Sequence, residues 1–147
     1  MTVDSALVTR KLLLIARDLD ALQPILVRGI ESYQASRIDQ AVTERYLERM
    51  VGRMIDVNYH LLTESGEPPP SDYFASFVLL GPLGVLDATF ARHIASCAGL
   101  RNRIVHEYDE LDPQRVFAAL ESALRDIPVY LAGVESYLAQ IERGPGG

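Results

Sequence analysis

The stretch that decides the fold spans residues 37–65 and reads RIDQAVTERYLERMVGRMIDVNYHLLTES. A helix turns by about 100° per residue, which places five apolar side chains of this stretch on one face. These are Leu47, Met50, Met54, Val57 and Leu61. Gly66 follows directly and is typical of a helix C-terminus. The stretch therefore predicts a long amphipathic helix that begins at Arg37 or Asp39 and has the two methionines in the core.

The opposite face of this helix carries charged and polar residues. They are Arg45, Arg49, Arg53, Asp56 and His60. The three arginines have two interpretations: a track for phosphate groups, or a solvated face whose charges pair with the flanking Glu44 and Glu48. Asp56 is either a carboxylate that supports Arg101 or His106 from the other helix, or the partner of Arg53 or another neighbour in a plain salt bridge. His60 is predicted to be an ordinary, partly buried histidine.

Helical patterns continue on both sides of this stretch. A first helix is predicted to begin near Asp4 or Ser5, and Pro24 is expected to kink or end it because proline lacks an N–H and crowds the preceding turn. After the central helix, Ser71 is predicted to cap a short helix that the Gly81-Pro82 turn ends.

Two more helices complete the pattern. Asp87 is predicted to start one of them, with Gly99 as an irregularity inside it. Asp112 caps the last helix and Pro113 takes its first position, where the missing N–H costs nothing; Pro128 should bend it. Alternation typical of strands is nearly absent. The predicted fold class is all-α, an up-and-down bundle of four or five helices.

Composition limits the function classes. The chain has 147 residues, and the formal charge of −6 argues against a general nucleic-acid coat protein. Its single cysteine, Cys97, excludes an internal disulfide and a four-cysteine zinc site. We expect one domain over residues 1–143 and a disordered glycine-rich tail over residues 144–147. No apolar run could span a membrane and no secretory signal is visible, so a cytoplasmic location is expected.

The side chains best suited to catalysis or ligand binding lie in the segment Leu100–Tyr108, which reads LRNRIVHEY. Asn102 and His106 are four residues apart and share a helix face, and Arg101 lies one residue from that line. A guanidinium group can hold two phosphate oxygens, and an imidazole can move a proton near neutral pH. This combination suits a phosphodiester.

A plainer interpretation stays open at this stage. Arg101 can pair with Glu107 or Asp109, and His106 can lie in an ordinary interface. No metal site is predicted, because the histidines lack the short spacing of helical metal ligands. The three histidines are His60, His93 and His106.

The order of Arg101, Asn102 and His106 resembles the motif of HEPN domains, which are small helical ribonucleases. With Tyr108 included, the segment is similar to the motif of HepT-like toxins from HEPN/MNT toxin–antitoxin systems, and the resemblance covers the chain from about Tyr46 to Tyr137. It implies a HEPN-type bundle that acts as a homodimer, in which two copies of the motif form one composite site.

The resemblance also implies roles for individual residues. The chain is expected to be a metal-independent endoribonuclease without a cofactor, in which Arg101 stabilises phosphate charge, His106 is the acid or base and Asn102 orients them. Independently of the resemblance, Asp56 is the candidate for a supporting residue, and Arg103 extends the possible RNA track formed by the arginines of the central helix. The implied partner is an MNT-type nucleotidyltransferase antitoxin that transfers AMP to Tyr108 and so blocks the site.

Two rival functions remain open. The chain could be a non-catalytic HEPN module that binds a nucleotide or a partner nucleotidyltransferase, with the same arginine and histidine holding a phosphate. It could also be a helical adaptor for dimerisation. A dimer is expected in all three cases, because long helices with two functional faces leave a bundle of this size little surface to cover both.

Overall fold

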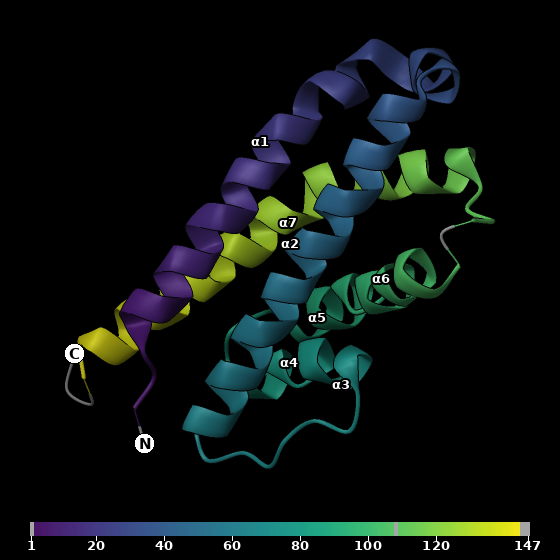
Figure 1. Ribbon diagram of the computed structural model, residues 1–147. Helices are drawn as coiled ribbons and strands as arrows, with labels where there is room; N and C mark the ends of the chain where they lie inside the picture. Colours follow the sequence, from purple (N-terminus) through teal and green to yellow (C-terminus); the bar gives the residue numbers. More distant parts are fainter. Residues whose placement is uncertain (1, 108, 145–147) are drawn as a thin grey trace.

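A computed structural model describes residues 2–107 and 109–144, and this part of the chain is helical throughout apart from turns and loops (Figure 1). The helices are α1 (Ser5–Ala35), α2 (Arg37–Glu64), α3 (Tyr73–Val78), α4 (Leu80–Leu83), α5 (Ala88–Ile94), α6 (Cys97–His106) and α7 (Pro113–Glu142). The predicted all-α fold class is therefore confirmed for the described residues. The predicted tail at 144–147 lies outside them, except for Gly144.

Three long helices form the body of the molecule. α1 and α2 run antiparallel side by side, and α7 crosses behind them, in contact with both (Figure 1). Of the short helices, α3, α4 and α6 contact α2, and α5 packs against α3 and α4. No helix of the described chain has the length and apolar character needed to cross a membrane.

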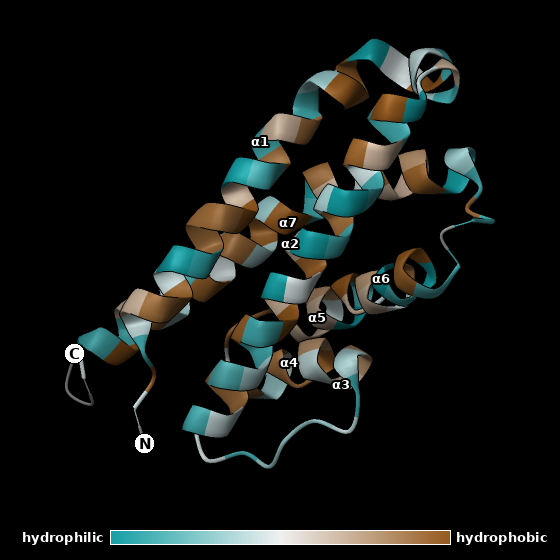
Figure 2. Cartoon of the chain, in the orientation of Figure 1, coloured by the Kyte–Doolittle hydropathy of each residue, from teal (hydrophilic) through white to brown (hydrophobic). Residues whose placement is uncertain are grey.

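The helix predicted from residues 37–65 is observed as α2, and all five apolar side chains of its predicted inner face are buried. Figure 2 shows hydrophilic and hydrophobic residues alternating along α1 and α2, as expected for helices with one buried face. Ser36 caps α2 by accepting a hydrogen bond from the N–H of Asp39 at 3.1 Å. Gly66 follows the helix with a positive φ of 88°, as glycine at a helix end allows.

The first helix begins as predicted, because the carboxylate of Asp4 accepts a hydrogen bond from the N–H of Leu7. Of the two effects expected of Pro24, a kink or an end, the end is absent, since α1 continues through this residue to Ala35. Pro24 and Asp20 are both exposed, so water can reach the Asp20 carbonyl that proline leaves without a partner. The non-helical residue of α1 is instead Gly29, with φ 88° and ψ 170°.

The short helix after the proline loop differs from its prediction at both ends. Asp72, not Ser71, caps α3, and its carboxylate accepts from the N–H of Ala75 at 2.7 Å. The Gly81-Pro82 pair does not end a helix but lies inside α4, where proline in the first turn needs no N–H donor. Gly84, with a φ of 90°, ends α4.

The later helices confirm their predicted starts. Asp87 caps α5, and Asp112 caps α7 with proline at the first helical position. The predicted irregularity at Gly99 is wrong: the break lies at residues 95–96, between α5 and α6, and Gly99 is part of α6. α7 continues through Pro128. The five predicted helices are thus present. Two of them are divided, one into α3 and α4 and the other into α5 and α6.

A chain of buried polar groups joins α7, α2 and α3. The hydroxyl of Tyr130 donates to Asn58 Oδ1 at 2.7 Å, and the amide of Asn58 donates to Ser76 Oγ at 3.2 Å. The Ser76 hydroxyl in turn donates to the backbone carbonyl of Tyr73 at 2.7 Å. All three side chains are buried, so these hydrogen bonds fix the position of α3 against α2.

Candidate functional site

Arg101 projects from α6 toward α2 and α3. Its guanidinium carbon lies 5.4 Å from the ring centre of Tyr73, and Nη1 lies 3.5 Å from the side-chain oxygen of Asn102. Its Nε–H group is buried and has no hydrogen-bond partner within the described residues. Within the described residues, Arg101 forms no ion pair with Glu107 or Asp109. The alternative interpretation, in which Arg101 pairs with one of these carboxylates, is therefore wrong.

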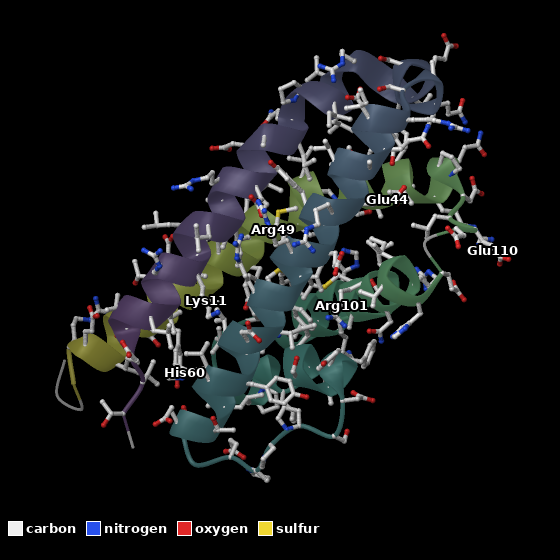
Figure 3. All side chains as sticks on the ribbon, in the orientation of Figure 1. Lys11, Glu44, Arg49, His60, Arg101 and Glu110 are labelled. Carbon is white, nitrogen blue, oxygen red and sulfur yellow. The ribbon has the colours of Figure 1, made fainter. Side chains whose placement is uncertain are left out.

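A cavity of about 320 Å³ lies between α2, α3 and α6, and we call it the arginine cavity. Its lining consists of Arg45, Glu48, Arg49, Gly52, Arg53, Ile55, Asp56, Tyr73 and Arg101. Figure 3 shows Arg101 on α6 beside α2, and Arg49 near the middle of α2, nearer the N-terminal end of that helix. The structure therefore brings Arg101 together with the arginine stripe of the central helix.

The stripe is held by a residue that was not among the sequence candidates. Asp18 of α1 is buried and accepts hydrogen bonds from Arg49 Nε at 2.9 Å and Arg53 Nη1 at 3.0 Å. Its hydrogen bond raises the pKa of Arg49. Arg45 pairs with Glu48 at 3.6 Å, as the solvated-face interpretation expects. Two of the three arginines are thus oriented by α1 and not by neighbours on their own helix.

Asp56 also lines the arginine cavity, and it forms a plain salt bridge with a neighbour other than Arg53. The carboxylate pairs with Lys11 of α1 at 3.3 Å, and Arg53 pairs with Asp18 instead. The cavity lining holds four arginines and two carboxylates, so its formal charge is positive. An acidic protein can therefore present a local site for an anion.

The remaining motif residues lie around α6. Asn102 and His106 are exposed, and His106 has no hydrogen bond or ion pair with another described residue. Arg103 does not share the arginine cavity: it lines a separate cavity of about 300 Å³ between α6 and α7. The predicted modification site, Tyr108, lies outside the described residues.

Other sequence candidates have structural roles. His60 is partly buried, as predicted, and its Nε2 accepts the N–H of Asp4 at 2.9 Å. His93 Nε2 lies 2.7 Å from a carboxylate oxygen of Asp126. The described residues contain no group of three or more potential metal ligands. Cys97 is partly buried, and burial raises its pKa to about 12.

Sequence reasoning missed Asp18 and Tyr73 as members of the site. A signal for Asp18 was present, because it lies at helical spacing between Ile15 and Leu22 on the apolar face of the first helix. A charged residue at such a position requires a partner. No comparable signal exists for Tyr73, since its contact with Arg101 joins residues that are far apart in the chain.

The bundle has the fold of HEPN proteins. It matches the tri-AMPylated HEPN toxin of Shewanella oneidensis in complex with an MNT antitoxin, with a TM-score of 0.79, 22% identity and coverage of 88% of this chain and 96% of that one. A toxin–antitoxin structure with AMP-PNP matches with a TM-score of 0.81, 20% identity and coverage of 90% and 99%.

The sequence profile of the ribonuclease HepT-like family matches residues 15–134, and the chain belongs to this family. It is also 36% identical to the tRNA nuclease HepT of Aphanizomenon flos-aquae (strain 2012/KM1/D3) over 140 residues, which cover 95% of both chains. The predicted resemblance and the predicted endoribonuclease class are thereby confirmed.

Proposed function

We propose that this chain is the toxin of an HEPN/MNT toxin–antitoxin system and that it cleaves tRNA. The observation that carries the proposal is Arg101: its buried Nε–H has no partner within the described chain, and it faces a cavity that it shares with three further arginines. A phosphate group in this cavity would supply acceptor oxygens and the opposite charge for the guanidinium group. The similar protein from Aphanizomenon is named as a tRNA nuclease, which supports tRNA as the substrate.

The chemistry follows from the residue types of the motif. The ribose 2′-hydroxyl attacks the adjacent phosphorus, the bond to the 5′-oxygen breaks, and a 2′,3′-cyclic phosphate and a 5′-hydroxyl form. His106 takes the proton from the 2′-hydroxyl or returns one to the 5′-oxygen, and Arg101 stabilises the negative charge on the phosphate. The substrate carries its own nucleophile, so the residues of the motif suffice without a metal ion.

A homodimer completes the site in this proposal. Arg101 and His106 are five residues apart on α6, so they point in directions about 140° apart around the helix axis. Arg101 is partly buried in the arginine cavity, whereas His106 is exposed. A second copy that places its α6 against the first brings His106 of one protomer toward Arg101 of the other, which supports the composite site.

Control by an antitoxin is the remaining part of the proposal. The Shewanella toxin of the same fold is described as tri-AMPylated and in complex with an MNT antitoxin. In this chain the acceptor would be Tyr108, which follows His106 by two residues. Each added AMP carries a phosphate, so modification places bulk and negative charge next to Arg101 and His106 and repels the RNA backbone.

The test compares His106→Ala, Arg101→Ala and Arg10→Ala on purified tRNA, with detection of 2′,3′-cyclic phosphate ends. Arg10 is the control, because it has the same charge as Arg101 but is exposed on α1 and lines neither cavity. We expect the first two variants to lose at least about 100-fold in rate and the control to keep most activity. Full cleavage by His106→Ala would remove the catalytic assignment, and binding without cleavage by the wild type would favour a non-catalytic module.

A second arm tests the regulation. Co-expression with an MNT-type nucleotidyltransferase encoded beside this chain should add AMP to Tyr108, detected by mass spectrometry of the intact protein and its peptides. Tyr108→Phe should stay unmodified and active. AMP on another residue, with activity lost all the same, would contradict the assignment of Tyr108.

A further inference from the structure

Beside the arginines, the arginine cavity has one aromatic wall. Tyr73 lines it together with Arg101, and 39% of the Tyr73 residue surface stays exposed although the ring lies 5.4 Å from the Arg101 guanidinium carbon. Three other arginines line the cavity on the α2 side; Arg45 pairs with Glu48, and Arg49 and Arg53 share the single carboxylate of Asp18, which leaves a net positive charge. An aromatic ring beside several guanidinium groups is the combination that binds a nucleotide, with the ring for its base and the cations for its phosphate.

The position of Tyr73 is well determined by its surroundings. Its backbone carbonyl accepts the Ser76 hydroxyl, which belongs to the buried chain of hydrogen bonds that includes Asn58 and Tyr130. Its ring packs edge-on with Tyr59 at a centre-to-centre distance of 6.2 Å. A ring held in this way loses little conformational entropy when a base stacks on it.

We infer that Tyr73 is a stacking site for one base of the RNA substrate, next to the phosphate that Arg101 binds. The inference rests on the proposed function, because the ligand is the RNA of that function. Arg101 and Tyr73 are close enough for both to contact the same nucleotide or two successive ones. Any base can stack on an aromatic ring, so this contact adds affinity and positions the RNA strand without sequence specificity.

The neighbouring residue provides a matched control. Phe74 lies beside Tyr73 at the start of α3 and is 49% exposed, but it does not line the arginine cavity. The variant Phe74→Ala removes an exposed aromatic ring from the same helix turn as Tyr73 and leaves the cavity lining intact. Tyr73→Phe keeps the ring and removes the hydroxyl, and Tyr73→Leu keeps apolar volume without a ring.

The experiment uses the full chain and two 2′-O-methyl oligonucleotides of about ten residues, one with 2-aminopurine bases and one abasic. Neither has a 2′-hydroxyl nucleophile, so binding is measured without cleavage. We expect the wild type, Tyr73→Phe and Phe74→Ala to bind the base-containing strand alike and to quench 2-aminopurine fluorescence. Tyr73→Ala and Tyr73→Leu should bind it about tenfold more weakly and lose the quenching, with unchanged affinity for the abasic strand.

Three results would overturn the inference. The first is equal affinity of the wild type for the two strands, and the second is unchanged quenching by Tyr73→Ala and Tyr73→Leu. The third is an equal loss of affinity for both strands in these two variants, which would mean that the ring only holds Arg101 in place. Cleavage of unmodified tRNA by the wild type is measured separately. Base-dependent binding without cleavage would therefore refute the proposed function and leave the stacking site standing.

Discussion

Asp18 of α1 and Arg49 of α2 form a two-point ion pair, in which Nε and Nη2 of the guanidinium donate to the two carboxylate oxygens. Arg53 donates to the same carboxylate. Asp18 is 2% exposed, so its charge is balanced by these two arginines and not by water. The pair connects the first helix to the cavity that we propose holds RNA.

Asp18→Asn is expected to lower the free energy of unfolding by about 1–3 kcal/mol, because it weakens hydrogen bonds between charged groups at a buried position. Asp20→Asn is the control, since Asp20 is exposed on the same helix and should change stability by less than about 0.5 kcal/mol. Urea unfolding followed by circular dichroism measures both. Equal stability of the two variants would show that the pair contributes little.

Tyr130→Phe should also destabilise the fold, because it leaves the buried oxygen of Asn58 without the hydroxyl that lies 2.7 Å away. A loss of about 1–3 kcal/mol is expected for such an unpaired buried group. Tyr137→Phe is the comparison, since its hydroxyl lies 3.3 Å from Ser65 Oγ at a half-buried position that water can reach. In thermal unfolding, the melting temperature of Tyr130→Phe should be clearly lower than that of Tyr137→Phe.

Two helical glycines should respond to alanine with opposite signs. A Cβ at Gly133 of α7 would lie 2.7 Å from Leu86 Cδ2 and 2.9 Å from the Val85 carbonyl oxygen, so Gly133→Ala forces the backbone apart and costs about 1–3 kcal/mol. A Cβ at Gly52 of α2 meets nothing within 4 Å, and Gly52→Ala should stabilise by up to about 1 kcal/mol. Urea midpoints that shift in the same direction would contradict this contrast.

Cys97 should react slowly with iodoacetamide in the folded protein. Burial raises its pKa to about 12, so the neutral thiol predominates at pH 8 and the reactive thiolate is rare. The alkylation rate should therefore rise about tenfold per pH unit from pH 8 to 10, whereas in urea it should level off near pH 9. A plateau below pH 9 in the folded protein would contradict the raised pKa.

Much of the secondary structure follows from local patterns in the sequence. The apolar spacing of residues 37–65 predicted α2 and its buried face, and Asp112 with Pro113 predicted the start of α7. Helix breaks were less predictable. The Gly81-Pro82 pair suggested a helix end and Gly99 suggested an irregularity inside a helix, and both are absent. The break at residues 95–96 has neither glycine nor proline.

In the functional site, too, some features could be predicted from the sequence and others could not. By itself, the sequence determined the motif of Arg101, Asn102 and His106 and the arginine stripe of the central helix, because these are spacings along one helix and depend only on its periodicity. Only the tertiary structure decided that Asp18 orients the stripe and that Tyr73 lies against Arg101. Those contacts depend on which helix faces pack together, and that is set by burial over the whole chain.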